Sequence, residues 1–381
     1  MALTVPGIDP NARLAEPQEA ISTEELRLAG RNHAMPMEAM RWDVTPAGLH
    51  YLLIHCDVPR VDETSWRLSV GGCLRRPLSL GLADLAAMPQ QTVRVTLECA
   101  GNGRAQLSPR PVSQPWLDGA VGTADWTGVR LRDLLTDAAL ETTAANVLFT
   151  GCDHGLERGV EQDYARALSV ADSMTAEVLV AIAMNGQPLP PQHGFPARLI
   201  VPGWYGMAHV KWLRDITVLD HAYEGFQNAV AYQFRQDPTD PGEPVTRIEP
   251  RALLAAPGFP DFMSRTRVAR PGQVRLEGRA WSGWAPVDRM EVSTDDGATW
   301  VDAELGADHG RWAWRGFSTV WDATPGRHLL RVRAHDQSGR SQPDVSSWNR
   351  GGFANNADQP VEVIVLESAS SPTQPTMDGW L

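Results

Sequence analysis

A single cysteine, Cys99, stands where an apolar strand gives way to a turn of small residues, in the stretch Thr96-Leu97-Glu98-Cys99-Ala100-Gly101-Asn102-Gly103-Arg104. One thiol cannot build a disulfide framework or a tetrahedral zinc site. It can act as a nucleophile, bind a metal whose other ligands come from a cofactor, or pack in the core. Free cysteine is among the most often buried residue types, so this stretch alone favours a core thiol. The rest of the sequence reverses that preference.

The stretch resembles the cofactor-ligand segment of the sulfite oxidase family of molybdenum enzymes, in its bacterial, haem-free branch. In that family a Cys-Ala-Gly-Asn tetrad followed by arginine supplies the one protein ligand to the metal. The resemblance covers residues from about 27 to 367. Four further segments match the family in the same order: Arg31-Asn32-His33, Phe149 to Gly155, the long block from Ala183 to Leu213, and Trp348 to Gly352.

The resemblance implies a molybdenum cofactor, which is an anionic pterin phosphate that carries a dithiolene, with Cys99 as the metal ligand. Its pocket needs fixed cations and amide-rich turns. Charge-assisted contacts from His, Arg and Lys can offset the desolvation of a buried phosphate. By family position, the residues that would hold the pterin and its phosphate are Asn32, His33, Asp153, His193, Arg198 and Lys211.

The same resemblance implies a substrate side. Arg31 and Arg104 would form a receiver for an oxyanion, because the planar guanidinium fork matches sulfite or sulfate oxygens. Tyr164 would donate to the metal oxygen, and Trp116 would form part of the pocket wall. The family's Trp-Asn-x-Arg-Gly segment appears one residue out of register, so Arg350 would reach the pocket by a different path.

We expect oxidation of sulfite to sulfate by oxygen-atom transfer, with electrons passed to a separate acceptor such as a cytochrome. We expect no haem and no flavin. Gly103 stands where many sulfite oxidases carry a second arginine, and the loop from Trp204 to Met207 also departs from the family. These departures keep nitrate reduction and sulfane-sulfur oxidation open. A non-enzymatic immunoglobulin-like scaffold with a vestigial pocket is a further alternative.

The elements that must position these residues change in character along the chain. Leu131, Leu134, Leu135 and Ala138 fall at helical spacing, whereas the runs 93–97 and 199–201 are apolar throughout, as in buried strands. We therefore expect an α+β fold, with a mixed α/β catalytic domain of the sulfite oxidase type over residues 27–245. Residues 1–26 would form an N-terminal extension.

Beyond the proline- and glycine-rich passage 237–244, short alternating strands separated by turns predict an all-β immunoglobulin-like sandwich over residues 246–367. Asp295-Asp296-Gly297 is a hairpin signal, with Trp300 on the return strand. The family uses this domain for dimerisation, so we expect a homodimer. Residues 368–381 would be a flexible tail.

Composition limits the other classes of function. A formal net charge of −12 argues against general binding of nucleic acid, and no run of eighteen apolar residues predicts a membrane span. The four cysteines lack the spacing of a structural zinc or covalent haem site. The N-terminus has no secretory pattern, so we expect a cytoplasmic protein, or a periplasmic one if a leader has been removed.

Overall fold

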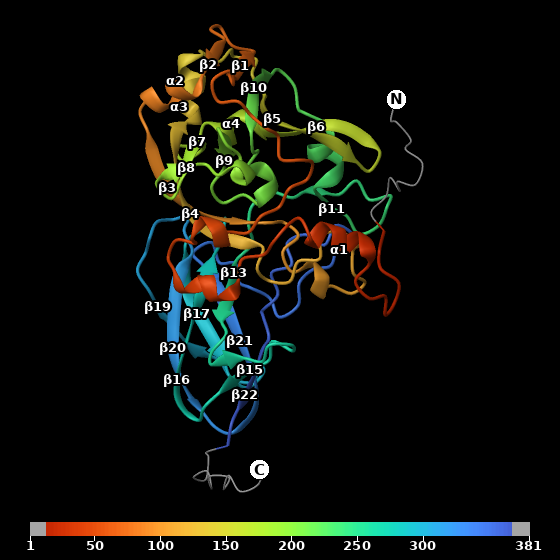
Figure 1. Ribbon diagram of the computed structural model, residues 1–381, viewed down its shortest axis with the longest axis vertical. Helices are drawn as coiled ribbons and strands as arrows, with labels where there is room; N and C mark the ends of the chain where they lie inside the picture. The colour runs from red at the N-terminus through yellow and green to blue at the C-terminus, as the bar shows by residue number, and fades with distance from the viewer. Residues whose placement is uncertain (1–12, 368–381) are drawn as a thin grey trace, which may run out of the picture.

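The computed structural model describes residues 13–367; the predicted tail and the first part of the predicted N-terminal extension lie outside them. Two units follow one another, and Figure 1 shows them end to end. Within the described range the first unit mixes sheets with short helices, whereas the second, from residue 251 on, consists of strands and loops. This confirms the predicted α+β class with an all-β second part. No helix in residues 13–367 is long and apolar enough to cross a membrane.

The first unit is built on two sheets. One has the order β2-β1-β10-β5-β6 and is antiparallel except for the pair β1 and β10. Its strands are β1 (Leu68–Gly72), β2 (Leu78–Leu80), β5 (Asn146–Glu157), β6 (Val160–Ser169) and β10 (Leu213–Leu219). The other runs β3-β4-β7-β8, with β9 also paired to β7. Its strands are β3 (Gln91–Glu98), β4 (Val121–Arg130), β7 (Leu179–Met184), β8 (Gln187–Pro188) and β9 (Arg198–Ile200).

Short helices and turns connect these strands. They are α1 (Thr23–Ala29), α2 (Leu82–Ala87), α3 (Leu131–Asp137), α4 (Val170–Ser173), the 3₁₀ turns η1 (Met37–Arg41), η2 (Ala47–Leu49), η3 (Arg104–Gln106), η4 (Pro191–His193) and η5 (Gly206–Ala208), and the π-helical turn η6 (Gln227–Ala231). Leu131, Leu134 and Leu135 of α3 are fully buried, which confirms the helix predicted from their spacing. The apolar run 93–97 lies in β3, and β9 begins one residue before the predicted strand at 199.

The second unit is a sandwich of two sheets, linked to the first through the small ladder of β11 (Gln233–Phe234) and β12 (Glu243–Pro244). One sheet contains β13 (Arg251–Ala255), β16 (Gly272–Trp281), β20 (Arg315–Ala323) and β19 (Glu304–Leu305). The other contains β14 (Phe259–Pro260), β15 (Arg267–Ala269), β22 (Val361–Val365), β21 (Gly326–Asp336), β17 (Val287–Ser293) and β18 (Val301–Asp302). Alternate residues of these strands face one shared core, as period-two patterning requires.

The predicted hairpin joins β17 to β18. Asp296 and Gly297 have φ values of 59° and 84°, the left-handed conformations that Asp-Gly turns supply. Trp300 lies one residue before β18 rather than on it.

A shared apolar cluster joins the two units. Met40, Val121 and Tyr205 of the first unit pack with Trp281 and Trp314 of the second, and all five are buried. The close approach of the backbones explains one glycine, because a Cβ on Gly283 would lie 2.0 Å from the carbonyl oxygen of Gly203. The sandwich is therefore packed against the part of the first unit that carries the Cys99 loop.

Candidate active site

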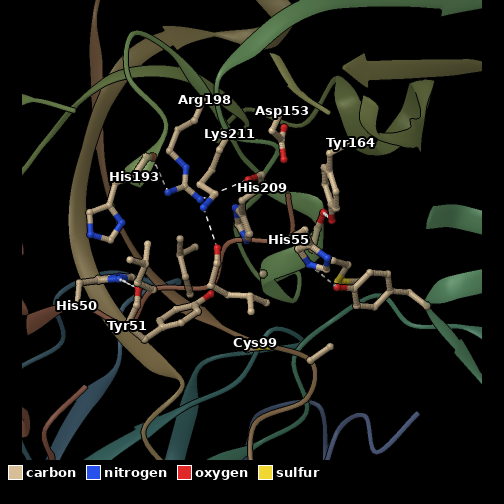
Figure 2. A pocket seen from close by; sticks show the side chains of 17 residues that line it. His50, Tyr51, His55, Cys99, Asp153, Tyr164, His193, Arg198, His209 and Lys211 are labelled. Carbon is tan, nitrogen blue, oxygen red and sulfur yellow. Dashed lines mark hydrogen bonds between the residues drawn. The ribbon is translucent and has the colours of Figure 1, made fainter. Parts of the chain in front are cut away.

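A cavity lined by seventeen residues opens in the first unit. Its walls come from the segment 50–55, the end of β3, β5, β6, η4, β9, η5, the segment 209–211 and the residue after η6. Figure 2 shows Cys99 on one side of this cavity, with Arg198 and Lys211 across it. The lining residues are His50, Tyr51, Leu52, Leu53, His55, Leu97, Cys99, Ala100, Asp153, Tyr164, His193, Arg198, Gly206, Met207, His209, Lys211 and Tyr232.

Cys99 reaches the cavity because β3 ends one residue before it. Its backbone N–H donates to the Ala120 carbonyl at 2.9 Å, and its own carbonyl accepts from the N–H of Asn102 at 2.9 Å, which closes a tight turn. Burial raises the pKa of the Cys99 thiol, while the Arg104 guanidinium, the Gly101 backbone and the Trp116 indole oppose this rise. The surroundings thus already include groups that favour a thiolate.

Two cations stand across the cavity from the thiol, Arg198, which is buried, and Lys211, which is half-buried. Arg198 donates to the carbonyls of His193 at 3.0 Å and His209 at 3.3 Å, and its guanidinium lies 4.7 Å from the ring centre of Trp126. Lys211, the only lysine of the sequence, donates to the carbonyls of Leu53 at 2.7 Å and Gln192 at 3.3 Å. Among residues 13–367 neither cation forms an ion pair with a carboxylate.

The charge of these cations is therefore poorly compensated by the protein. Burial lowers the pKa of Lys211 to about 7, with Arg198 adding to the effect, and lowers the pKa of Arg198 to about 10. Burial also lowers the pKa of His193 to about 2, so this ring is neutral at pH 7. An anionic ligand bound between these groups would raise the pKa of Lys211 and of Arg198 and so favour their charged forms.

Asp153, on β5, adds a carboxylate to the cavity wall that carries Arg198 and Lys211. The pairing of β5 with β6 shifts register between Thr150 and His154, and this irregularity lies where Asp153 enters the cavity. Burial raises the pKa of Asp153 to about 6, although Lys211 opposes the rise. Its Oδ1 has no hydrogen-bond partner among the described residues, and the same holds for Arg198 Nε and His50 Nε2. Buried polar atoms are rarely left without partners, so these three atoms mark a ligand site that requires both donors and acceptors.

Two tyrosines and a histidine line the cavity on another side. The Tyr164 hydroxyl donates to the Met207 carbonyl at 2.8 Å, so its position is fixed. The Tyr232 hydroxyl and His55 Nε2 share a hydrogen bond of 3.0 Å, and the His55 ring lies 5.1 Å from that of Tyr164. His55 Nδ1 in turn lies 3.7 Å from Glu157. Burial raises the pKa of both tyrosines, so both are neutral donors.

The structure brings together six of the residues predicted from the sequence. Cys99, Tyr164, Asp153, His193, Arg198 and Lys211 all line the cavity. The sequence reasoning did not identify five other polar residues of the lining, which are His50, Tyr51, His55, His209 and Tyr232. Of these, only His209 stands in a segment that had been singled out.

The Arg31-Asn32-His33 triplet is not among the residues that line the cavity. It pairs with the outer side of the wall segment, through backbone hydrogen bonds between His33 and Leu52 at 3.2 and 2.9 Å. The Asn32 side chain also binds this segment, because its Oδ1 accepts a hydrogen bond from the Ile54 N–H at 2.8 Å. The side chains of Arg31 and His33 are exposed, and Arg31 donates to the Cys56 carbonyl. The triplet therefore braces the wall segment 50–55, and the charge of Arg31 contributes to lowering the pKa of Lys211.

Arg104 and Trp116 lie behind Cys99 rather than in the cavity wall. The Arg104 Nε donates to the Gly351 carbonyl at 2.8 Å, and the guanidinium packs 5.3 Å from the Phe353 ring centre. Both side chains are buried, and the indole nitrogen of Trp116 has no partner that meets hydrogen-bond geometry. Arg104 thus acts on the thiol through its charge.

Arg350, which was predicted to reach the pocket, is not among the residues that line this cavity. Its backbone N–H donates to the Arg235 carbonyl at 2.8 Å, and its charge contributes to lowering the pKa of Asp237. Its neighbours make the contact instead, because Gly351 and Phe353 touch Arg104.

The departure from the family at Gly103 has a structural cause. Gly103 has φ +83°, a left-handed conformation that glycine adopts readily. A Cβ at this position would lie 2.9 Å from Asn355 Nδ2, and that amide donates to the Gly103 carbonyl at 2.7 Å. Asn355 therefore occupies the space that a side chain at position 103 would need.

Comparisons with known proteins agree with this geometry. Residues 55–227 match the model of the oxidoreductase molybdopterin binding domain, and residues 255–365 match the Mo-co oxidoreductase dimerisation domain. Sulfite oxidase of Gallus gallus is 36% identical over 82% of this chain and 72% of its own length. Mitochondrial sulfite oxidase of Rattus norvegicus is 35% identical over 85% of the chain, which spans 62% of that relative.

Two further matches widen the range of chemistry among similar proteins. An NADH nitrate reductase of Volvox carteri is 33% identical over 87% of this chain and 42% of its own length. Among solved structures, the sulfane dehydrogenase SoxCD of Paracoccus pantotrophus superposes with a TM-score of 0.77 at 24% identity, covering 94% of this chain and 90% of that one. At that identity the likeness shows the fold.

Proposed function

Because the chain belongs to the sulfite oxidase family of molybdenum-dependent oxidoreductases, we propose that it oxidises sulfite to sulfate and passes the electrons to a separate carrier. The observation that carries the proposal is the cavity itself. One thiol faces two cations that have no carboxylate partner among the described residues, with unpaired donors and an unpaired acceptor between them.

These residues fit a molybdenum cofactor. Cys99 would bind the metal, and Arg198 and Lys211 would bind the phosphate, since fixed cations and an anion compensate one another when both are buried. Asp153 Oδ1 and His50 Nε2 would meet the polar edge of the pterin. The described residues contain no cluster of three His, Cys, Asp or Glu that could hold a metal ion, so the remaining ligands would come from the cofactor. When bound, this group supplies the transferable oxygen and the two-electron redox couple.

The chain's own residues would bind the anion and move protons. Sulfite and water give sulfate, two electrons and two protons, so the site must accept an oxyanion and release protons. Tyr232 and Tyr164 present neutral hydroxyl groups at the cavity, and Arg104 supplies positive charge behind the thiol. The hydrogen bond from Tyr232 to His55 leads toward Glu157 and gives a released proton a first acceptor.

The test is an assay of the purified protein together with its metal content. We expect molybdenum in near-equal amount to protein and sulfite-dependent reduction of ferricyanide. A Cys99→Ser variant should retain the pterin but lose turnover, because the hydroxyl is a far poorer metal ligand than a thiolate. Nitrate-dependent oxidation of a reduced dye without sulfite turnover would contradict the proposed substrate, and similar proteins include nitrate reductases.

We also propose a homodimer formed through the second unit. The match of residues 255–365 to a family model of a dimerisation domain supports this assembly. Sedimentation of the full-length protein at micromolar concentration tests it, and a monomer there would contradict it.

A further inference from the structure

A buried polar network ties the sandwich to the loop that carries Cys99. Glu98, the residue before the cysteine, is 1% exposed and accepts three hydrogen bonds from side chains. Its Oε1 accepts from Asn102 Nδ2 at 2.9 Å and from Arg251 at 3.0 Å, and its Oε2 accepts from Trp281 Nε1 at 2.8 Å. Arg251 and Trp281 belong to β13 and β16 of the sandwich. The carboxylate at the base of the thiol turn is therefore held largely by the other unit.

Arg251 is the centre of this network. The residue is 2% exposed, and its guanidinium donates to Glu98, to Asp118 at 2.8 Å, and to the carbonyls of Asn102 at 3.3 Å and Asn355 at 2.7 Å. Two of these four acceptors flank Cys99 in sequence, on either side of the turn. The planar fork of arginine suits such a spread of acceptors, whereas the single ammonium of lysine does not.

A second set of hydrogen bonds joins the segment at Ala354 and Asn355 to the same loop. The N–H of Ala354 donates to the Ala100 carbonyl at 2.8 Å, and the Asn355 amide donates to the Gly103 carbonyl at 2.7 Å. Because the Asn355 carbonyl also accepts from Arg251, the network closes around the loop. The turn from Glu98 to Gly103 is thus clamped on its first, middle and last residues by the sandwich.

We propose that Arg251 is a positioning residue for the metal site, which from the sandwich holds the Glu98–Gly103 loop so that the Cys99 thiol faces the cavity. The inference rests on the proposed function in so far as the thiol binds a metal. Removal of the guanidinium is costly, because the buried carboxylate of Glu98 and the half-buried carboxylate of Asp118 would each lose a compensating cation. The loop would open locally before the rest of the protein unfolds.

The sandwich supplies a matched control. Arg279, on β16, also binds the first unit, through Asp43 at 2.7 Å and the Met40 carbonyl at 2.7 Å, and its exposure is 9%. Within residues 13–367 its guanidinium hydrogen bonds go to Met40, Asp43 and Arg41, none of which belongs to the Glu98–Gly103 loop. A change at Arg279 therefore weakens the joint between the units without touching the thiol turn.

The experiment measures the rate at which iodoacetamide alkylates each cysteine of the full-length protein, produced without cofactor and read by peptide mass spectrometry. In the wild-type protein Cys99 is the one fully buried cysteine, and Cys56, Cys73 and Cys152 are half-buried internal references. In Arg251→Met we expect the rate at Cys99 to rise about tenfold or more relative to these references, as expected for a local opening. Arg251→Lys, which keeps the charge and is the milder variant, should give a smaller rise in the same direction.

In Arg279→Met we expect the alkylation rates of all four cysteines to change by the same factor or to stay as in the wild type. If Arg251→Lys and Arg251→Met leave Cys99 as protected as in the wild type, or if Arg279→Met exposes it equally, the inference is overturned. Because the measurement needs no cofactor, it stands apart from the proposed function. Absence of molybdenum from the wild-type protein would defeat that function and leave this result intact.

Discussion

Lys211 should titrate far below an ordinary lysine in the protein without cofactor. Burial, reinforced by Arg198, lowers its pKa from 10.5 to about 7. In the unfolded chain the same amine keeps its ordinary pKa. Between the two values the unfolded state binds one more proton than the folded state, so the free energy of unfolding rises with pH from 7 to 10.5.

The size of this effect follows from the shift. If the full pKa shift applies, the free energy of unfolding is about 5 kcal/mol lower below pH 7 than above pH 10.5. Lys211 keeps some contact with solvent, so we expect roughly half of this value. As the pH rises from 7.5 to 9.5, the free energy of unfolding of the wild type should therefore increase by about 1 to 3 kcal/mol relative to that of Lys211→Met. The lost hydrogen bonds to Leu53 and Gln192 shift that difference by a constant and cancel from its pH dependence.

Two measurements test this prediction. Urea unfolding of cofactor-free wild type and Lys211→Met gives the difference in free energy at each pH. Labelling with ¹³C-lysine gives a direct readout, because the sequence holds one lysine and Lys211→Met must remove its signal. A signal that titrates near pH 10.5, or a free-energy difference that does not change with pH, would refute the claim that the cations of the cavity lack a compensating negative charge.

Three further predictions concern the loop and the substrate side. Arg104→Gln should raise the Michaelis constant for sulfite by about tenfold through loss of a charge near the thiol, whereas Arg31→Gln should leave it within about twofold, as steady-state kinetics will show. Tyr232→Phe removes the hydroxyl that bonds His55 and should lower kcat/KM by about tenfold; unchanged kcat/KM would exclude it from the reaction. Gly103→Arg should lower the melting temperature because of the positive φ and the Asn355 contact, and a stability equal to wild type would show that the loop can adjust.

The elements that are local in sequence were predictable. The helix at Leu131 and the strand that leads to Cys99 follow from hydrophobic spacing, since each is decided by neighbours within a few residues. The cations Arg198 and Lys211 were predicted from their family positions. Arg198 opens β9 and Lys211 stands two residues before β10, and the N–H of Leu199 donates to the Val210 carbonyl at 2.8 Å, which holds the two stretches side by side.

The residues that the structure leaves out of the cavity lining are those whose place depends on which side of a segment faces the cavity. Arg31-Asn32-His33 carries the right residue types, but its backbone pairs with Leu52 and its side chains are not among the lining residues. Arg350 stands one residue from a glycine that does contact Arg104, and a change of one position redirects the side chain. Sequence order carries no information on such a choice of face when a segment has no regular period.

The sequence by itself predicted the class of fold from apolar periodicity, and its resemblance to the family singled out the Cys99 thiol and the cations Arg198 and Lys211. Only the tertiary structure decided the partners that are far apart in the chain. His55 meets Tyr232 across 177 residues, and Glu98 meets Arg251 across 153, from different units of the fold. Such pairs form when two sheets and a sandwich pack together, and their energy depends on burial that no single segment possesses.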